Sequence, residues 1–251
     1  MTFQNDQKSE LHNVSVELGL CSIPHFALYP QLLPWVGQFY LTCPLRVLVL
    51  GESHYLKPES TYHLDSEAWY KGVDLSSATD VGHFKTRGII KNGIAKQWAG
   101  KSKLIYRNIA AAIVASGLVH CDSPFQYISY MNYFQRPAQA SGDSLAPSAQ
   151  DKLHSARVVS SVIEILQPEL VICCSSLAWG AAKEMGLIGN SVSLKTVFVR
   201  SVHPATRWWN TKMKKHKELT GTQLFVHGIK NRLNNLINRD VPVWAELEAT
   251  E

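Results

Sequence analysis

Leu45-Arg-Val-Leu-Val-Leu-Gly51 is the stretch that decides the fold. It is rich in leucine and valine and stops at a glycine, which is typical of a short, buried β-strand. Residues 125–134, 169–174 and 195–202 have a similar character, although aromatic residues dominate the first of them. The sequence therefore predicts four strands.

Helical segments separate or follow these strands. Apolar residues recur at helical spacing in 102–117, 147–167, 177–185 and 220–238. Strands that alternate with helices form a mostly parallel sheet with both faces covered. We expect an α/β fold, specifically a three-layer α/β/α sandwich around a central four-stranded parallel sheet.

The length of 251 residues favours one domain with appendages over two domains. Residues 1–44 are polar and then interrupted by prolines, so we expect an N-terminal arm that packs on the domain. The domain should span 45–240, followed by a C-terminal tail at 241–251. Residues 52–100 form a long polar and aromatic stretch, and such long segments inside a domain are usually functional.

The composition excludes several classes of protein. Hydrophobic residues make up 45% of the chain and charged residues 18%, which is ordinary for a soluble globular protein. No apolar run approaches the ~20 residues of a membrane helix, and the N-terminus lacks the pattern of a signal peptide.

The formal net charge of +5 fits an anionic partner such as nucleic acid, although many basic proteins bind none. We expect a cytoplasmic monomer with no membrane partner.

The five cysteines are odd in number and lack CxxC spacing. Two of them, Cys173 and Cys174, lie inside an apolar run. This usage indicates reduced thiols rather than a disulfide framework, a zinc site or an iron–sulphur cluster. We therefore expect no metal and no cofactor.

Polar residues follow the predicted strands, where parallel sheets bind their ligands. The strand ends are Gly51-Glu-Ser-His-Tyr55, Asn132-Tyr133, Ser175-Ser176 and His203-Pro204. Three of these four ends carry groups suited to recognition or catalysis. A loop glutamate, or a lone histidine before a proline, is often merely structural. A functional site is therefore expected only if these strand ends act together.

Four motifs resemble the uracil-DNA glycosylase superfamily, in its order and spacing, over about 45–238. Gly51–Tyr55 resembles its first motif, and Tyr130-Met-Asn-Tyr-Phe-Gln-Arg-Pro137 resembles the base-recognition strand, especially that of the thermophilic branch. Residues 166–178 are similar to its third strand–turn–helix, and Ser201-Val-His-Pro-Ala205 to its terminal HPS or HPA motif. The four cluster cysteines of the thermophilic branch are absent. His54 stands where the family has proline, and Ser175 where it has glycine.

The resemblance implies a monofunctional DNA glycosylase that acts by water attack and leaves an abasic site. Glu52 would orient the water and stabilise the cationic sugar, and His203 would donate to the departing base. Asn132 offers both a donor and an acceptor and could read a pyrimidine edge. His54 either positions the water or fills a turn.

The resemblance also implies a base pocket and a DNA surface. The base-binding candidates are Gly51, Ser53, Tyr55, Asn132 and, as a stacking ring, Phe84, with Trp98 in reserve. Tyr55 could exclude 5-substituted pyrimidines, and Phe84 could equally be a core residue. The DNA-binding candidates are Ser175, Arg207, Trp208, Lys212 and Lys214. Residues 206–216 would form the wedge that enters the duplex, although its lysines could be a solvated face and its tryptophans core anchors.

Three functions remain open at this point. Uracil in DNA is the default substrate by resemblance. The alternative within enzymes is a bulky modified pyrimidine in phage DNA. A protein of this fold that only binds nucleic acid or another protein is the alternative from a different class, and a filled pocket or an outward-pointing Glu52 would favour it.

Overall fold

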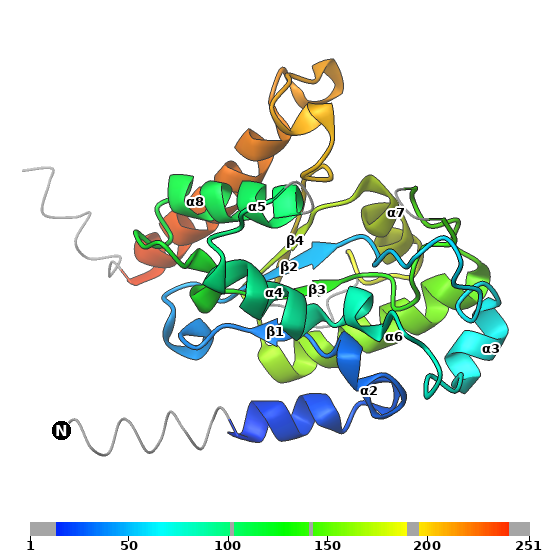
Figure 1. The fold of residues 1–251 in the computed structure, drawn as a ribbon. Coiled ribbons are helices and arrows are strands. Elements are labelled where there is room, and N and C mark those ends of the chain that lie inside the picture. Colours follow the sequence, from blue (N-terminus) through cyan, green and yellow to red (C-terminus); the bar gives the residue numbers. More distant parts are fainter. Residues whose placement is uncertain (1–13, 101–102, 141–142, 190–195, 241–251) are drawn as a thin grey trace, which may run out of the picture.

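The computed structural model describes residues 14–100, 103–140, 143–189 and 196–240. The predicted tail at 241–251 and the first 13 residues of the predicted arm lie outside these described residues. In the described part, a mostly parallel sheet is surrounded by helices in a mixed α/β fold (Figure 1). Within the described ranges, no helix is both long and apolar enough to cross a bilayer.

The sheet has five strands in the order β1-β3-β2-β4-β5. The strands span Trp35–Val36 (β1), Val47–Gly51 (β2), Ser129–Asn132 (β3), Leu170–Cys173 (β4) and Val197–Arg200 (β5). The last four are mutually parallel and correspond to the four predicted strands.

The expectation of a mostly parallel sheet is confirmed, but the sheet has a fifth strand that was not predicted, β1, which pairs antiparallel with β3 at the edge. A strand of two residues is too short to leave a periodic pattern in the sequence. It is held by distant partners instead. The indole N–H of Trp35 donates to the carbonyl of Phe125 at 2.7 Å, and the Ser129 hydroxyl donates to the carbonyl of Trp35 at 2.7 Å.

Helices lie against both faces of the sheet (Figure 1). The α-helices are α2 (Pro24–Leu28), α3 (Ser66–Lys71), α4 (Thr86–Ala95), α5 (Leu104–Ala115), α6 (Ala149–Leu166), α7 (Ser176–Glu184) and α8 (Gly221–Asp240), and residues 14–21 are also helical. Short 3₁₀ helices span Pro30–Leu32, Tyr40–Thr42, Val81–Phe84, Pro124–Tyr127, Arg207–Trp209 and Lys214–His216. The predicted strand at 125–134 therefore begins as a 3₁₀ turn, opened by Pro124.

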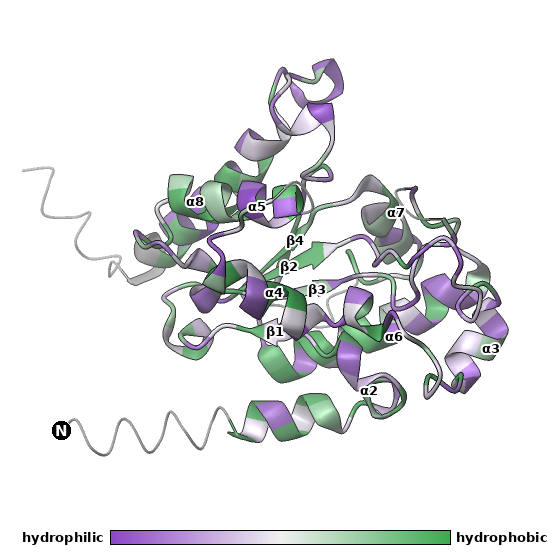
Figure 2. Cartoon of the chain, viewed as in Figure 1, coloured by the Kyte–Doolittle hydropathy of each residue, from purple (hydrophilic) through white to green (hydrophobic). Residues whose placement is uncertain are grey.

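Two hydrophobic clusters form the core, one on each face of the sheet. Successive residues of a strand point to opposite faces. Accordingly Leu48 and Leu50 pack with α2, α3, α6 and α7, whereas Val47 and Val49 pack with α4, α5 and α8. Figure 2 shows the hydrophobic character of the central strands. Residues 24–33 of the predicted arm contribute Phe26 and Tyr29 to the first cluster.

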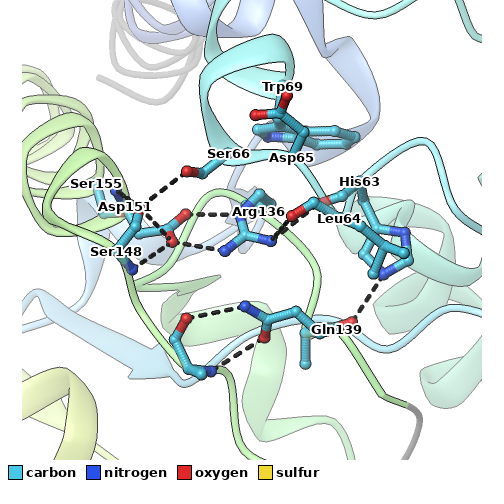
Figure 3. A network of polar contacts seen from close by, with 12 residues as sticks. His63, Leu64, Asp65, Ser66, Trp69, Arg136, Gln139, Ser148, Asp151 and Ser155 are labelled. Carbon is cyan, nitrogen blue, oxygen red and sulfur yellow. Dashed lines mark hydrogen bonds and ion pairs between the residues drawn. The ribbon is translucent and has the colours of Figure 1, made fainter.

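A buried ion pair joins the segment after β3 to α6 (Figure 3). Arg136 donates from Nε and Nη2 to the two carboxylate oxygens of Asp151 at 2.7 and 2.6 Å, and both side chains are at most 1% exposed. Nη1 of Arg136 also donates to the carbonyl of His63 at 2.9 Å. Burial acts to raise the pKa of Asp151, but hydrogen bonds from Arg136 and Ser148 outweigh it and lower that pKa. The pair fixes the loop before α3 against the helix that covers one face of the sheet.

Candidate active site

The carboxyl ends of β2 and β3 meet at a position where only glycine fits. Gly51 lies opposite Asn132 in the parallel register. A Cβ atom on Gly51 would stand 2.2 Å from Oδ1 of Asn132 and 2.4 Å from the hydroxyl of Tyr130. Those two atoms are themselves hydrogen-bonded, because the Tyr130 hydroxyl donates to Oδ1 at 3.1 Å. Gly51 therefore allows Asn132 to be held in one orientation at the strand end.

A cavity of about 410 Å³ opens at this edge of the sheet. It is lined by seven residues that the sequence singled out: Gly51, Glu52, Ser53, His54, Tyr55, Asn132 and His203. They come from the end of β2 and the loop that follows it, the end of β3 and the loop after β5. The structure thus brings the two main catalytic candidates and the base-reading candidate to one cavity.

Glu52 is buried and held at one carboxylate oxygen. Its Oε2 accepts a hydrogen bond from the Ser175 hydroxyl at 2.5 Å. Its Oε1 is buried and makes no hydrogen bond to any described residue, and the same is true of the neighbouring Ser53 hydroxyl. Both oxygens belong to residues that line the cavity, and a buried oxygen without a partner is a place where water or a ligand group can bind.

His203 presents a neutral ring to the cavity. Burial lowers the pKa of His203, and the Glu52 carboxylate opposes that shift only in part. Its Nδ1 accepts the backbone N–H of Ala205 at 3.3 Å, so the proton of the neutral ring belongs on Nε2. The amide of Asn108 on α5 donates to the carbonyl of Pro204 at 2.7 Å and so secures the chain beside the histidine. His203 can act as a neutral hydrogen-bond donor.

His54 lines the same cavity but is bound to α4. Its Nε2 lies 3.0 Å from the hydroxyl of Thr86, and the side chain is buried. Burial lowers the pKa of His54 to about 4, so the ring is neutral at neutral pH. The bond to Thr86 attaches His54 to α4, and His54 thereby anchors the loop that carries Glu52.

Acid should destabilise the fold through His54 and His25. Burial lowers the pKa of each ring from 6.5 to about 4. Between these values the unfolded chain binds more protons than the folded one, so the free energy of unfolding falls as pH decreases through this window and is fully retained above it. Each ring accounts for roughly 3 kcal/mol once pH is below both values.

Urea unfolding at pH 7 and pH 4.5 measures this loss. The variant His25→Gln should lose less stability on acidification than the wild type, because it lacks one of the rings whose pKa burial lowers. Equal free energies of unfolding at the two pH values would contradict the prediction.

The structure does not place the predicted stacking rings in the cavity. Phe84 is wholly buried and packs edge-on against Trp69, with ring centroids 6.0 Å apart. Trp98, the reserve candidate, is also buried, and it stacks on Tyr106 at 5.4 Å. Among the described residues, the tyrosines that line the cavity are Tyr55, Tyr106 and Tyr130.

Ser175 was predicted to contact DNA, but its side chain has no exposed surface. It lies behind Glu52 at the start of α7, so its position corrects that prediction. Lys103 and Tyr106, which lie at and just inside the start of α5, are among the cavity residues that sequence reasoning missed. Burial, and then the charge of Lys96, lowers the pKa of Lys103.

The remaining DNA-binding candidates lie on a segment that projects from the body of the fold, drawn in orange in Figure 1. Trp208 is 38% exposed and the Arg207 guanidinium lies 4.3 Å from the centre of its ring. Trp209 is buried against Phe225, so one tryptophan anchors the segment and the other faces outward. Lys212 and Lys214 are exposed.

No group of three or more His, Cys, Asp or Glu side chains in the described part of the chain is arranged to hold a metal ion. Comparison of the sequence with models of known protein families found no match, and comparison with curated proteins found none that is significantly similar.

Proposed function

We propose that the protein is a monofunctional DNA glycosylase, with a three-layer α/β/α sandwich of the uracil-DNA glycosylase type. It hydrolyses the bond between a pyrimidine base and its deoxyribose and leaves an abasic site. One observation carries the proposal: Glu52, Asn132 and His203, which come from three separate strand ends, line a single cavity. The open cavity and the inward position of Glu52 disfavour a protein that only binds.

The chemistry follows from the groups in the cavity. The target base enters after it leaves the base stack, as enzymes that act on bases in DNA require. Oε1 of Glu52 orients a water molecule toward C1′ of the sugar and stabilises the positive charge that develops there. Nε2–H of His203 donates to the base oxygen where negative charge accumulates, which stabilises the transition state more than the ground state. Asn132 binds the edge of the base.

Uracil is the default base, and a larger modified pyrimidine is the second candidate. The cavity of about 410 Å³ falls within the range of pockets that hold drug-sized ligands, so it has room beyond a bare pyrimidine ring. A large base would connect the activity with defence against phages that modify their DNA, and uracil would connect it with DNA repair.

Incubation with oligonucleotides that carry different bases at one position tests the proposal. Alkali cleaves the strand wherever a base has been removed. We expect cleavage for uracil or for a modified pyrimidine, and none for unmodified DNA. A panel with no alkali-labile product for any pyrimidine would overturn the proposal.

Trp208→Ala should reduce excision from duplex DNA more than excision from single strands. If residues 206–216 form a wedge, the exposed ring fills the space that the base leaves, and a single strand has no stacked partner to displace. Rates on matched single- and double-stranded substrates measure the difference. Equal losses on the two substrates would show that Trp208 supports the fold rather than the duplex contact.

Lys214→Ala should weaken DNA binding about equally for all sequences. An exposed lysine that contacts phosphate releases about one counterion, so the slope of log affinity against log salt should fall by about one unit. Binding measured across a salt series gives this slope. A variant at Lys152, which is paired with Glu184 away from the segment, should keep the wild-type slope. An unchanged slope for Lys214→Ala would remove the segment from the DNA interface.

A further inference from the structure

The Ser175 hydroxyl connects α7 to the catalytic carboxylate. Ser175 is the N-cap of α7, and its Oγ accepts the backbone N–H groups of Leu177 and Ala178 at 3.1 Å each. The same Oγ lies 2.5 Å from Oε2 of Glu52. A hydroxyl oxygen whose two lone pairs accept N–H groups has only its own proton left to offer. Ser175 is therefore the donor in the bond to Glu52.

This bond divides the carboxylate into two different oxygens. Oε2 is occupied by Ser175, whereas Oε1 is buried without a partner among the described residues and belongs to a residue of the cavity wall. The backbone on either side of Glu52 is also fixed, because the carbonyls of Gly51 and Glu52 accept N–H groups from Tyr133 and Phe134 at 3.1 and 2.9 Å. The remaining freedom of Glu52 is rotation of its side chain, and Ser175 restricts it.

We propose that Ser175 is a positioning residue: it holds Oε2 of Glu52 so that Oε1 is the oxygen that binds the attacking water. The inference rests on the proposed glycosylase activity. Ser175 contacts no substrate and acts through Glu52. The two N–H groups at the positive end of α7 polarise the hydroxyl and strengthen its bond to the carboxylate. A water held by a fixed oxygen attacks at a higher rate, because small errors in the orientation of reacting groups cost large factors in rate.

A double-mutant cycle tests this role. Ser175→Ala should slow single-turnover base release about 10- to 100-fold while the dissociation constant for DNA changes by less than about 3-fold. In the Glu52→Gln background, the same substitution should change the rate by less than about 2-fold, because Ser175 acts only through the carboxylate. Ser175→Thr keeps the hydroxyl and suits an N-cap, so it should recover most of the rate.

Asp65→Ala is the matched control for the loss of a helix cap. Asp65 caps α3 by accepting two backbone N–H groups, as Ser175 does for α7, but it lies outside the cavity. It should cost stability without slowing base release. The inference would be overturned if Asp65→Ala slowed base release as much as Ser175→Ala does. It would also be overturned if the effects of Ser175→Ala and Glu52→Gln on the rate simply multiplied.

A structural readout separates this inference from the proposed function. If the wild type releases no base from any substrate, the proposed function fails. Crystal structures of the wild type and Ser175→Ala then decide the positioning role on their own. A Glu52 carboxylate that rotates away in the variant supports it, and one that keeps its orientation overturns it.

Discussion

Glu52→Gln is expected to slow base release about 10²- to 10⁴-fold in single-turnover experiments, which is the range for loss of a general base. The amide fills the same space but carries no negative charge to orient water or to stabilise a cationic sugar. Binding of DNA should change little, because the carboxylate acts mainly on the transition state. Rates and dissociation constants measured on the same oligonucleotide separate the two effects.

Glu67→Gln provides a matched control, since it makes the same chemical change on an exposed carboxylate of α3. It should leave the rate unchanged. A wild-type rate for Glu52→Gln would remove this residue from the chemistry, and a parallel loss of DNA binding would assign it to substrate affinity instead.

Asp151→Ala is expected to lower the free energy of unfolding by about 3–5 kcal/mol, because it leaves the Arg136 guanidinium buried without its counter-charge. The same carboxylate also accepts the backbone N–H of Ser148 at 2.8 Å and the hydroxyl of Tyr70 at 3.1 Å, and both bonds are lost with it. Urea denaturation measures the change.

Glu184→Ala is the control, because it breaks an ion pair whose two members, Lys152 and Glu184, are 27% and 53% exposed. It should lower the free energy of unfolding by less than about 1 kcal/mol. If Asp151→Ala cost no more than this control, the buried pair would not be a main support of the fold.

The strands and the place of the candidate site at their ends could be predicted because both leave local patterns. Apolar runs with a clear end, at Gly51 and before Ser175, identify β2 and β4. The rule that parallel sheets bind ligands at their carboxyl ends directs attention to Glu52 and His203. Both of these residues line the cavity together with Asn132. The order of the motifs along the chain was therefore enough to predict which strand ends form the candidate site.

The rest depends on contacts between residues far apart in the chain. Phe84 has the aromatic side chain that a stacking residue needs, but it packs against Trp69 in the core. The sequence around Ser175 is typical of an exposed loop. The side chain is nevertheless buried and bonded to the carboxylate of Glu52, 123 positions away. Strand β1 is formed by pairing with β3, and its two residues carry no periodicity of their own. Such contacts become visible only when the chain is folded.

The mass of the DNA after incubation with the protein tests the central claim most directly. Hydrolysis of an N-glycosidic bond removes the base and adds a hydroxyl group at C1′ while the strand stays intact. We predict an oligonucleotide product lighter by that difference, together with the free base, from a substrate that carries uracil or a modified pyrimidine. Glu52→Gln should form this product far more slowly. An unchanged strand, or a broken strand that still carries the base, would contradict the account.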